Sequence, residues 1–131
     1  MNPYAQTNAY NDAAVLTASP EQLVVMLYDG AVRFLRQAQH ALGEGAYLHA
    51  HEKLGRAEAI LDELLATLNM DVGEISERLQ SIYLFCKRCL VEARLEREPK
   101  KIGDVIALML DLRGAWAAIA AREPAAAPAT A

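Results

Sequence analysis

Apolar residues recur every three or four positions along most of this chain, in four blocks separated by short polar breaks. This spacing places the apolar side chains on one face of an α-helix, so each block predicts an amphipathic helix. No segment alternates with a period of two over the length of a strand. The four sets of apolar positions are Leu23, Leu27, Ala31, Phe34, Ala38 and Leu42; Leu54, Ala57, Leu61, Leu64 and Leu68; Ile75, Leu79, Ile82, Cys86, Cys89 and Ala93; and Ile102, Val105, Met109, Leu112, Trp116 and Ile119.

The start of the first helix is marked by local capping signals. Ser19 is a good N-cap, and Pro20 suits the first helical position because no N–H is needed there. Gln22, three residues after Ser19, can close a capping box. We therefore expect this helix to run from Pro20 to about Leu42, where the Gly43-Glu44-Gly45 segment ends it.

The later helices are bounded by polar segments and by proline. Residues 69–73 break the second block, and the third helix is expected to run from about Glu74 to Glu98. Pro99 should stop it, since proline cannot continue a helix, and Lys100 should start the link to the fourth helix. Within the first helix, Gly30 costs ~1 kcal/mol relative to alanine and therefore indicates a close neighbour.

Four helices with short connections predict an all-α, antiparallel up-down four-helix bundle. Residues 1–18 lack helical periodicity and are expected to form an extended N-terminal arm. Residues 19–122 form the bundle, and residues 123–131 are expected to be a disordered Ala/Pro tail with nothing to bury.

Composition limits the class of protein. The 131 residues suffice for one domain, and although 53% of them are hydrophobic, no apolar run approaches the ~20 residues that span a bilayer. The amino terminus lacks the basic and apolar segments of a signal peptide, so we expect a cytoplasmic protein without membrane insertion. The formal net charge of −4 makes a nucleic-acid partner unexpected.

A second row of apolar residues accompanies the third and fourth helices. Either the core faces of these helices are broad, or part of the row faces outward as a groove for a partner. The pattern leaves both interpretations open. The row contains Tyr83, Leu90, Val91, Ile106, Leu108 and Leu110.

Two patterns could indicate a metal or redox site. Cys86 and Cys89 have the spacing of a redox motif but lie mid-helix on the apolar face, so we expect two buried thiols, with neither a disulfide nor a zinc site. None of the three histidines follows a glutamate at the spacing that di-iron bundles require. No catalytic residue, metal ligand or cofactor is therefore expected.

His51 suggests an alternative function. Histidine phosphotransfer domains are also four-helix bundles, and they carry a lysine three residues and a glycine four residues after the reactive histidine. Gly55 matches this pattern, but Leu54 takes the lysine position and Lys53 turns to a different face. We keep a histidine phosphotransfer-type bundle using His51 as the alternative hypothesis.

Between residues 3 and 118 the chain resembles the FliS family of flagellar secretion chaperones. The resemblance is strongest in Asn2-Pro3-Tyr4, in Tyr10, in Thr17-Ala18-Ser19-Pro20 and in Met26-Leu27-Tyr28-Asp29-Gly30-Ala31. It continues to Trp116 and departs from the usual family residue at Ser76, Arg94 and Gly114.

This resemblance implies a function without catalysis. FliS proteins are bundles that bind the disordered carboxyl-terminal segment of flagellin in the cytoplasm, prevent its premature polymerisation and deliver it to the flagellar type III export gate. The implied partners are flagellin and an export-gate protein, with an anti-sigma regulator as a further candidate. Recognition is expected to place apolar anchors of the wrapped segment into surface channels of the bundle.

The resemblance also implies roles for particular residues. The arm with Tyr4 and Tyr10 should cover part of the groove until flagellin displaces it, and Tyr10 should contact the export gate. We expect three residues on the surface of the first helix and four in the apolar channel to bind partners. They are Tyr28, Asp29 and Arg33 on the helix surface, and Leu64, Leu68, Tyr83 and Leu90 in the channel.

Overall fold

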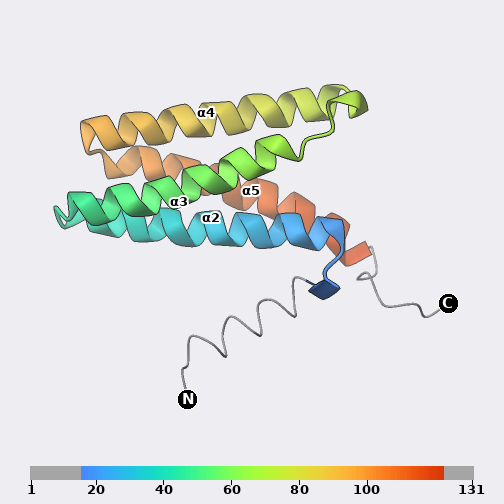
Figure 1. Cartoon of the computed structure of the whole chain (residues 1–131), viewed down its shortest axis with the longest axis horizontal. Helices are drawn as coiled ribbons and strands as arrows, with labels where there is room; N and C mark the ends of the chain where they lie inside the picture. The colour runs from blue at the N-terminus through green and yellow to red at the C-terminus, as the bar shows by residue number, and fades with distance from the viewer. Residues whose placement is uncertain (1–15, 123–131) are drawn as a thin grey trace, which may run out of the picture.

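A computed structural model describes residues 16–122 of the chain (Figure 1). The arm residues Tyr4 and Tyr10 and the tail 123–131 lie outside the described residues. Within the described range there are four long helices and one short 3₁₀ helix, and no strand. They are α2 (Pro20–Gly43), α3 (Tyr47–Ala66), η1 (Met70–Val72), α4 (Glu74–Glu96) and α5 (Pro99–Arg122).

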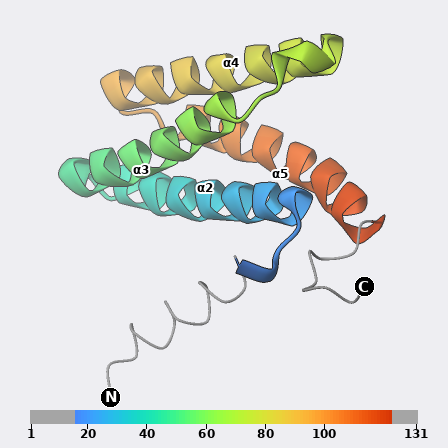
Figure 2. The same cartoon turned by 45° about the vertical axis from the view of Figure 1, so that its right-hand side comes forward.

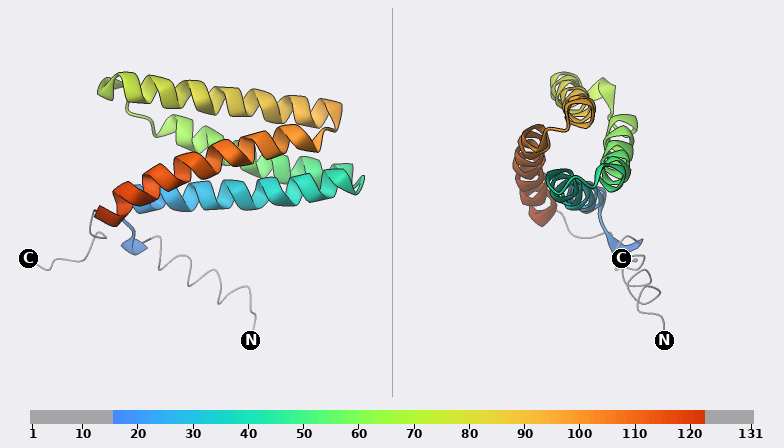
Figure 3. Two further views of the ribbon diagram at one scale, coloured as in Figure 1. Left: turned by 180° about the vertical axis from the view of Figure 1, so that it is seen from behind. Right: turned by 90° about the vertical axis from the view of Figure 1, so that its left-hand side faces the viewer.

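Successive helices run in opposite directions and form an antiparallel up-down bundle, which confirms the predicted fold class (Figure 1). Helix α2 packs most extensively, against both α3 and α5. Helix α4 lies across the bundle from α2 and contacts α3 and α5 less extensively (Figure 3). The core therefore has one tightly packed side around α2 and one looser side around α4.

The start of α2 has the predicted capping box. The Ser19 hydroxyl oxygen accepts a hydrogen bond from the Gln22 backbone N–H at 3.2 Å, and the Gln22 side chain accepts one from the Ser19 N–H at 2.9 Å. Pro20 is the first helical residue, and α2 ends at Gly43, one residue beyond the predicted end.

The junction between α4 and α5 corrects one prediction. Helix α4 ends at Glu96, Arg97 adopts the left-handed conformation with φ of 55°, and Pro99 begins α5 directly, so no link starts at Lys100. Proline is favourable at the first helical position because its missing N–H would have no partner there. The Glu98 carboxylate accepts a hydrogen bond from the Lys100 N–H at 3.1 Å, as a capping side chain does.

The core follows the predicted apolar faces except at one end of the bundle. Ile75 and Ile119 were both expected to face inward, but they are 61% and 43% exposed. They lie where the first turn of α4 and the last turns of α5 move apart (Figure 2). The largest fully buried side chains are those of Tyr28, Leu35, Leu54, Leu61, Tyr83, Cys86, Leu90, Ile102, Val105 and Met109.

The second apolar row divides between core and surface. Tyr83, Leu90 and Ile106 are buried, whereas Val91 and Leu110 are exposed. Both interpretations left open by the sequence therefore hold for part of the row.

Gly30 has the close neighbour that its position indicated. It is buried, and a β-carbon added there would lie 3.2 Å from Cδ1 of Ile60 on α3. The glycine thus lets α2 and α3 approach closely. None of the helices within residues 16–122 combines the length and apolar character needed to cross a membrane.

Candidate functional site

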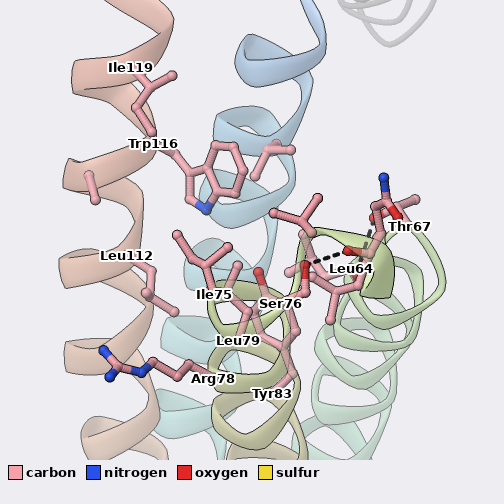
Figure 4. A pocket seen from close by; sticks show the side chains of 15 residues that line it. Leu64, Thr67, Ile75, Ser76, Arg78, Leu79, Tyr83, Leu112, Trp116 and Ile119 are labelled. Atoms are coloured by element: carbon pink, nitrogen blue, oxygen red, sulfur yellow. Dashed lines mark hydrogen bonds between the residues drawn. The ribbon is translucent and has the colours of Figure 1, made fainter.

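An apolar pocket of about 450 Å³ opens at the end of the bundle where α3 and α5 end and α4 begins (Figure 4). We call it the end pocket. Most of its lining is aliphatic or aromatic, and all four helices contribute to it. The lining residues are Val24, Leu64, Thr67, Leu68, Asn69, Val72, Ile75, Ser76, Arg78, Leu79, Tyr83, Leu112, Ala115, Trp116 and Ile119.

Local hydrogen bonds fix the rim of the end pocket. The Ser76 hydroxyl donates to the Asn69 carbonyl at 2.6 Å, which ties the first turn of α4 to the preceding loop. The Asn69 side chain accepts from the Asp71 N–H at 3.0 Å and so caps η1. The Thr67 hydroxyl donates to the Leu64 carbonyl at 3.1 Å at the end of α3. Ser76 thus has a structural role at the rim.

Tyr83, which lines the pocket, has a buried tyrosine partner on α2. The hydroxyl groups of Tyr28 on α2 and Tyr83 on α4 lie 2.5 Å apart, and both side chains are buried. Burial raises the pKa of Tyr28 above its ordinary value, and the hydrogen bond to Tyr83 adds to the rise. Burial also raises the pKa of Tyr83. Both hydroxyl groups therefore stay protonated, and Tyr83 presents an uncharged side chain to the pocket.

Trp116 forms one wall of the pocket. It is the only tryptophan in the chain, and its half-buried side chain points from α5 into the space between the helices (Figure 4). Sequence analysis placed it in the core, so its contribution to a surface pocket was missed. It is also a natural reporter of anything that enters the pocket.

The structure brings three of the four expected channel residues to one place. Leu64, Leu68 and Tyr83 all line the end pocket. Leu90 does not, because it lies fully buried in the core farther along α4, and its expected place in a channel is corrected. The expected surface position of Tyr28 is also wrong, since its ring packs in the core and its hydroxyl meets that of Tyr83.

Asp29 and Arg33 are exposed on α2, as expected for surface residues, but neither lines the end pocket. The Asp29 carboxylate accepts a hydrogen bond from Nε of Arg113 on α5 at 2.5 Å. The Arg33 guanidinium lies over the Phe34 ring, 5.2 Å from its centroid. These two residues therefore belong to surfaces other than the pocket.

A second apolar surface lies on α4. Four large apolar side chains are exposed on this helix beyond its first turn, and the Arg88 guanidinium lies 5.7 Å from the centroid of the Phe85 ring. We call these residues the outer α4 surface: Leu84, Phe85, Val91 and Leu95.

The two cysteines are free and buried, which confirms their interpretation as core residues. Burial raises the pKa of the Cys86 thiol to about 12, and the nearby Cys89 adds to the rise. A thiol that stays protonated is a poor nucleophile and a poor metal ligand. Among residues 16–122 there is no group of three or more His, Cys, Asp or Glu side chains that could hold a metal ion.

His51 lacks the features that phosphotransfer requires. Its Nε2 atom is buried and has no hydrogen-bond partner, so this nitrogen is not open to a phosphoryl donor. Lys53, the lysine nearest to His51 in the sequence, places its Nζ over the Phe34 ring, 5.7 Å from the ring centroid. No observation here favours the alternative function.

Comparisons with known proteins agree with one another. The family profile described as "Flagellar protein FliS" matches residues 1–123. The flagellar secretion chaperone FliS of Bacillus subtilis (strain 168) is 34% identical over 115 residues, which cover 88% of this chain and 84% of that protein. The protein of the same description from Salmonella typhimurium (strain LT2) is 36% identical over 115 residues, covering 86% and 84% of the two chains.

A solved structure shares the fold. A chain described as "Crystal structure of flagellar chaperone from bacteria" superposes with a TM-score of 0.75 at 20% sequence identity and covers 90% of this chain and 99% of its own. At that identity the likeness bears on the fold alone.

Proposed function

This chain belongs to the FliS family of flagellar proteins, and we propose that it is a flagellar secretion chaperone that binds the disordered carboxyl-terminal segment of flagellin. By covering the apolar faces of that segment it prevents premature polymerisation, and it then delivers flagellin to the type III export gate. No chemical step is involved, because the protein acts by holding and releasing its partner.

The end pocket is the observation that carries this proposal. A soluble protein gains free energy by burying apolar surface, so a large apolar pocket left open at the surface indicates a partner. The pocket is flanked by the exposed side chains of Ile75 and Ile119. A segment that becomes helical on binding can insert apolar anchors at intervals of three or four residues into such a pocket.

The outer α4 surface supports the idea of a segment that wraps around the bundle. Ordering a disordered segment costs ~2 to 5 kcal/mol or more of the interaction energy, so one small pocket would give weak binding. Contacts with both the end pocket and exposed residues such as Phe85 would bury more apolar area and offset that cost.

The start of α2 supports a role for the arm. Val24, in the second turn of α2, lines the end pocket, so the chain enters the bundle beside the pocket. An arm that covers the pocket until flagellin displaces it is consistent with this position. We assign Tyr10 to contact with the export gate, and a Tyr10→Ala variant that keeps gate binding would contradict that assignment.

The test uses Trp116 as a built-in probe. A peptide covering the carboxyl-terminal helical segment of the organism's own flagellin is titrated into the full chain while tryptophan emission is recorded. We expect a saturable blue shift, because the peptide removes water from around the indole. An Ile75→Gln/Ile119→Gln variant should bind the peptide about tenfold more weakly, equivalent to a loss of ~1.4 kcal/mol.

Leu48→Gln provides the matched control, since Leu48 is a highly exposed apolar residue that does not line the pocket. This variant should bind as the unmodified chain does. If all three proteins bound the peptide equally, the end pocket would not be the binding site.

A further inference from the structure

A cluster of positive charge surrounds one aromatic ring where α2 and α3 pack together. The Phe34 ring of α2 is half-buried and packs against the core. Its centroid lies 5.2 Å from the Arg33 guanidinium carbon, 5.7 Å from Nζ of Lys53 and 5.7 Å from the guanidinium carbon of Arg56. Cations at these distances are attracted to the ring. We call Arg33, Phe34, Lys53 and Arg56 the Phe34 patch.

The charge of this patch is poorly neutralised. Among the residues the structure describes, neither Arg33 nor Lys53 has a carboxylate within ion-pair distance. Arg56 meets Glu52 at 3.5 Å, but both side chains are more than half exposed, so solvent screens the pair. Asp29, one turn before Arg33, is bound to Arg113 instead.

This arrangement is unusual within a chain of net charge −4. Several other cations, including Lys87, Arg94 and Lys101, are paired with carboxylates of neighbouring helices. Three cations held close together repel one another, and a bound anion would relieve that repulsion. The Phe34 patch is therefore a site that attracts negative charge on a protein whose net charge is negative.

The Phe34 patch is separate from the end pocket, because the two share no residue. It lies where α2 and α3 run side by side, whereas α4 is on the other side of the bundle (Figure 1). A partner could therefore occupy the patch while the pocket is filled. The inference that follows does not depend on what binds in the pocket.

We propose that the Phe34 patch is a docking site for an acidic peptide segment of a protein partner. Carboxylates of such a segment would form charge-assisted hydrogen bonds with Arg33, Arg56 and Lys53, and an apolar neighbour would contact Phe34. A long polyanion fits less well, because the patch offers only three cations and the net negative charge of the chain repels nucleic acid and anionic lipid surfaces.

The test maps binding on the full chain by NMR. A short helical peptide with three glutamates around one leucine is titrated into the ¹⁵N-labelled protein, and a peptide with glutamines in place of the glutamates serves as its control. We expect amide shifts at the Phe34 patch and none at the end pocket. Binding should weaken severalfold when ~0.3 M NaCl is added, because salt screens exposed charges.

Two variants sharpen the result. Arg33→Gln/Lys53→Gln should weaken binding of the glutamate peptide at least fivefold, whereas Arg36→Gln should leave it unchanged. Arg36 is the matched control, since it is an exposed cation of α2 that does not lie over the Phe34 ring. Both changes are at exposed or half-exposed positions, and far-ultraviolet circular dichroism checks that the variants fold.

Several outcomes would overturn the proposal. They are equal binding of the glutamine peptide, shifts that map to the end pocket, and equal weakening by Arg36→Gln. If phosphatidylglycerol vesicles or duplex DNA shifted the amide signals of the patch and the glutamate peptide did not, the partner would be a membrane or a nucleic acid instead of an acidic peptide. Loss of the proposed site at the Phe34 patch would not by itself contradict flagellin binding at the end pocket.

Discussion

The buried hydrogen bond between Tyr28 and Tyr83 joins two residues that are far apart in sequence. It links α2 to α4, the two helices that face each other across the bundle. From the sequence, Tyr28 was expected on the surface of the first helix, because the family resemblance implied a partner-binding role for it. Its burial depends on a partner 55 residues away, which no local pattern reveals.

We expect the two hydroxyl groups to be strongly coupled. Tyr28→Phe or Tyr83→Phe alone leaves the other hydroxyl buried without this partner and should cost ~1 to 3 kcal/mol of stability. The double variant removes both hydroxyls and should cost less than the sum of the two single changes. Urea unfolding of the three variants measures this difference, and simple additivity would show that the two groups do not interact.

The Cys86 thiol predicts a dependence of stability on alkaline pH. Its pKa rises from an ordinary value of about 9 to about 12 in the folded protein, first because of burial. Between those values the unfolded chain loses the thiol proton while the folded chain keeps it. The free energy of unfolding should therefore fall as pH rises through this window, by at most ~1.4 kcal/mol per pH unit for this one group.

Urea unfolding between pH 8 and pH 10.5 would measure this slope. Cys86→Ala should give a shallower slope above pH 9. Some decrease in the free energy of unfolding should remain near pH 10.5, because the pKa values of Tyr28 and Tyr83 are also raised in the folded protein. Identical slopes for the two proteins would mean that Cys86 does not contribute.

At the level of single elements, two glycines in helices should respond differently to alanine. Gly55 lies mid-helix in α3 with open space around it, so Gly55→Ala should stabilise the protein by ~0.5 to 1 kcal/mol. Gly30→Ala gains the same helix propensity but places a methyl group 3.2 Å from Cδ1 of Ile60, which must shift.

We therefore expect Gly30→Ala to be close to neutral, and Gly30→Leu to cost ~2 kcal/mol or more. Thermal unfolding of the three variants compares them directly. A Gly30→Ala gain as large as that of Gly55→Ala would show that α2 and α3 do not need the glycine.

Helix α4 depends on ion pairs more than the other helices do. Lys87 and Arg94 of α4 pair with Asp62 and Glu58 of α3, and Glu92 of α4 pairs with Lys101 of α5 at 2.7 Å. Its apolar packing is less extensive than that of α2. The helix that borders the end pocket is thus also the one held partly by charges near the surface.

Removing the acidic partners on α3 should loosen α4. An Asp62→Asn/Glu58→Gln variant should exchange its α4 amide hydrogens about fivefold faster, a change of ~1 kcal/mol, while α2 exchanges as before. Glu52→Gln is the control, because Glu52 pairs with Arg56 inside α3 and joins no other helix. Uniformly faster exchange in all helices would instead indicate loss of overall stability.

The boundaries of the elements show what a sequence can predict. The capping box fixed the start of α2, because Ser19 and Gln22 act on the backbone next to them. Pro99 was misread, since proline both stops one helix and favours the start of another. Ile75 and Ile119 follow the helical period of the apolar positions but are exposed. Their exposure results from the separation of α4 and α5 at that end, which depends on how the helices pack and not on the local sequence.

At the scale of the whole molecule, tight packing around α2 contrasts with an open end beside α4. Periodicity predicted four helices and their antiparallel order, and the resemblance predicted a partner. The position of the end pocket could not be predicted, because it is formed by all four helices and by the loop around Asn69. Leu64, Leu68 and Tyr83 were found as candidates, but Trp116 was not.

The most direct test of the central claim is calorimetric titration of the full chain with the carboxyl-terminal peptide of its own flagellin at several temperatures. We expect one-to-one binding with a negative heat-capacity change, because apolar surface of the end pocket and of the peptide leaves water. The Ile75→Gln/Ile119→Gln variant should make that change smaller. A folded protein that gave no binding heat at any temperature would contradict the claim that this chain is a flagellin chaperone.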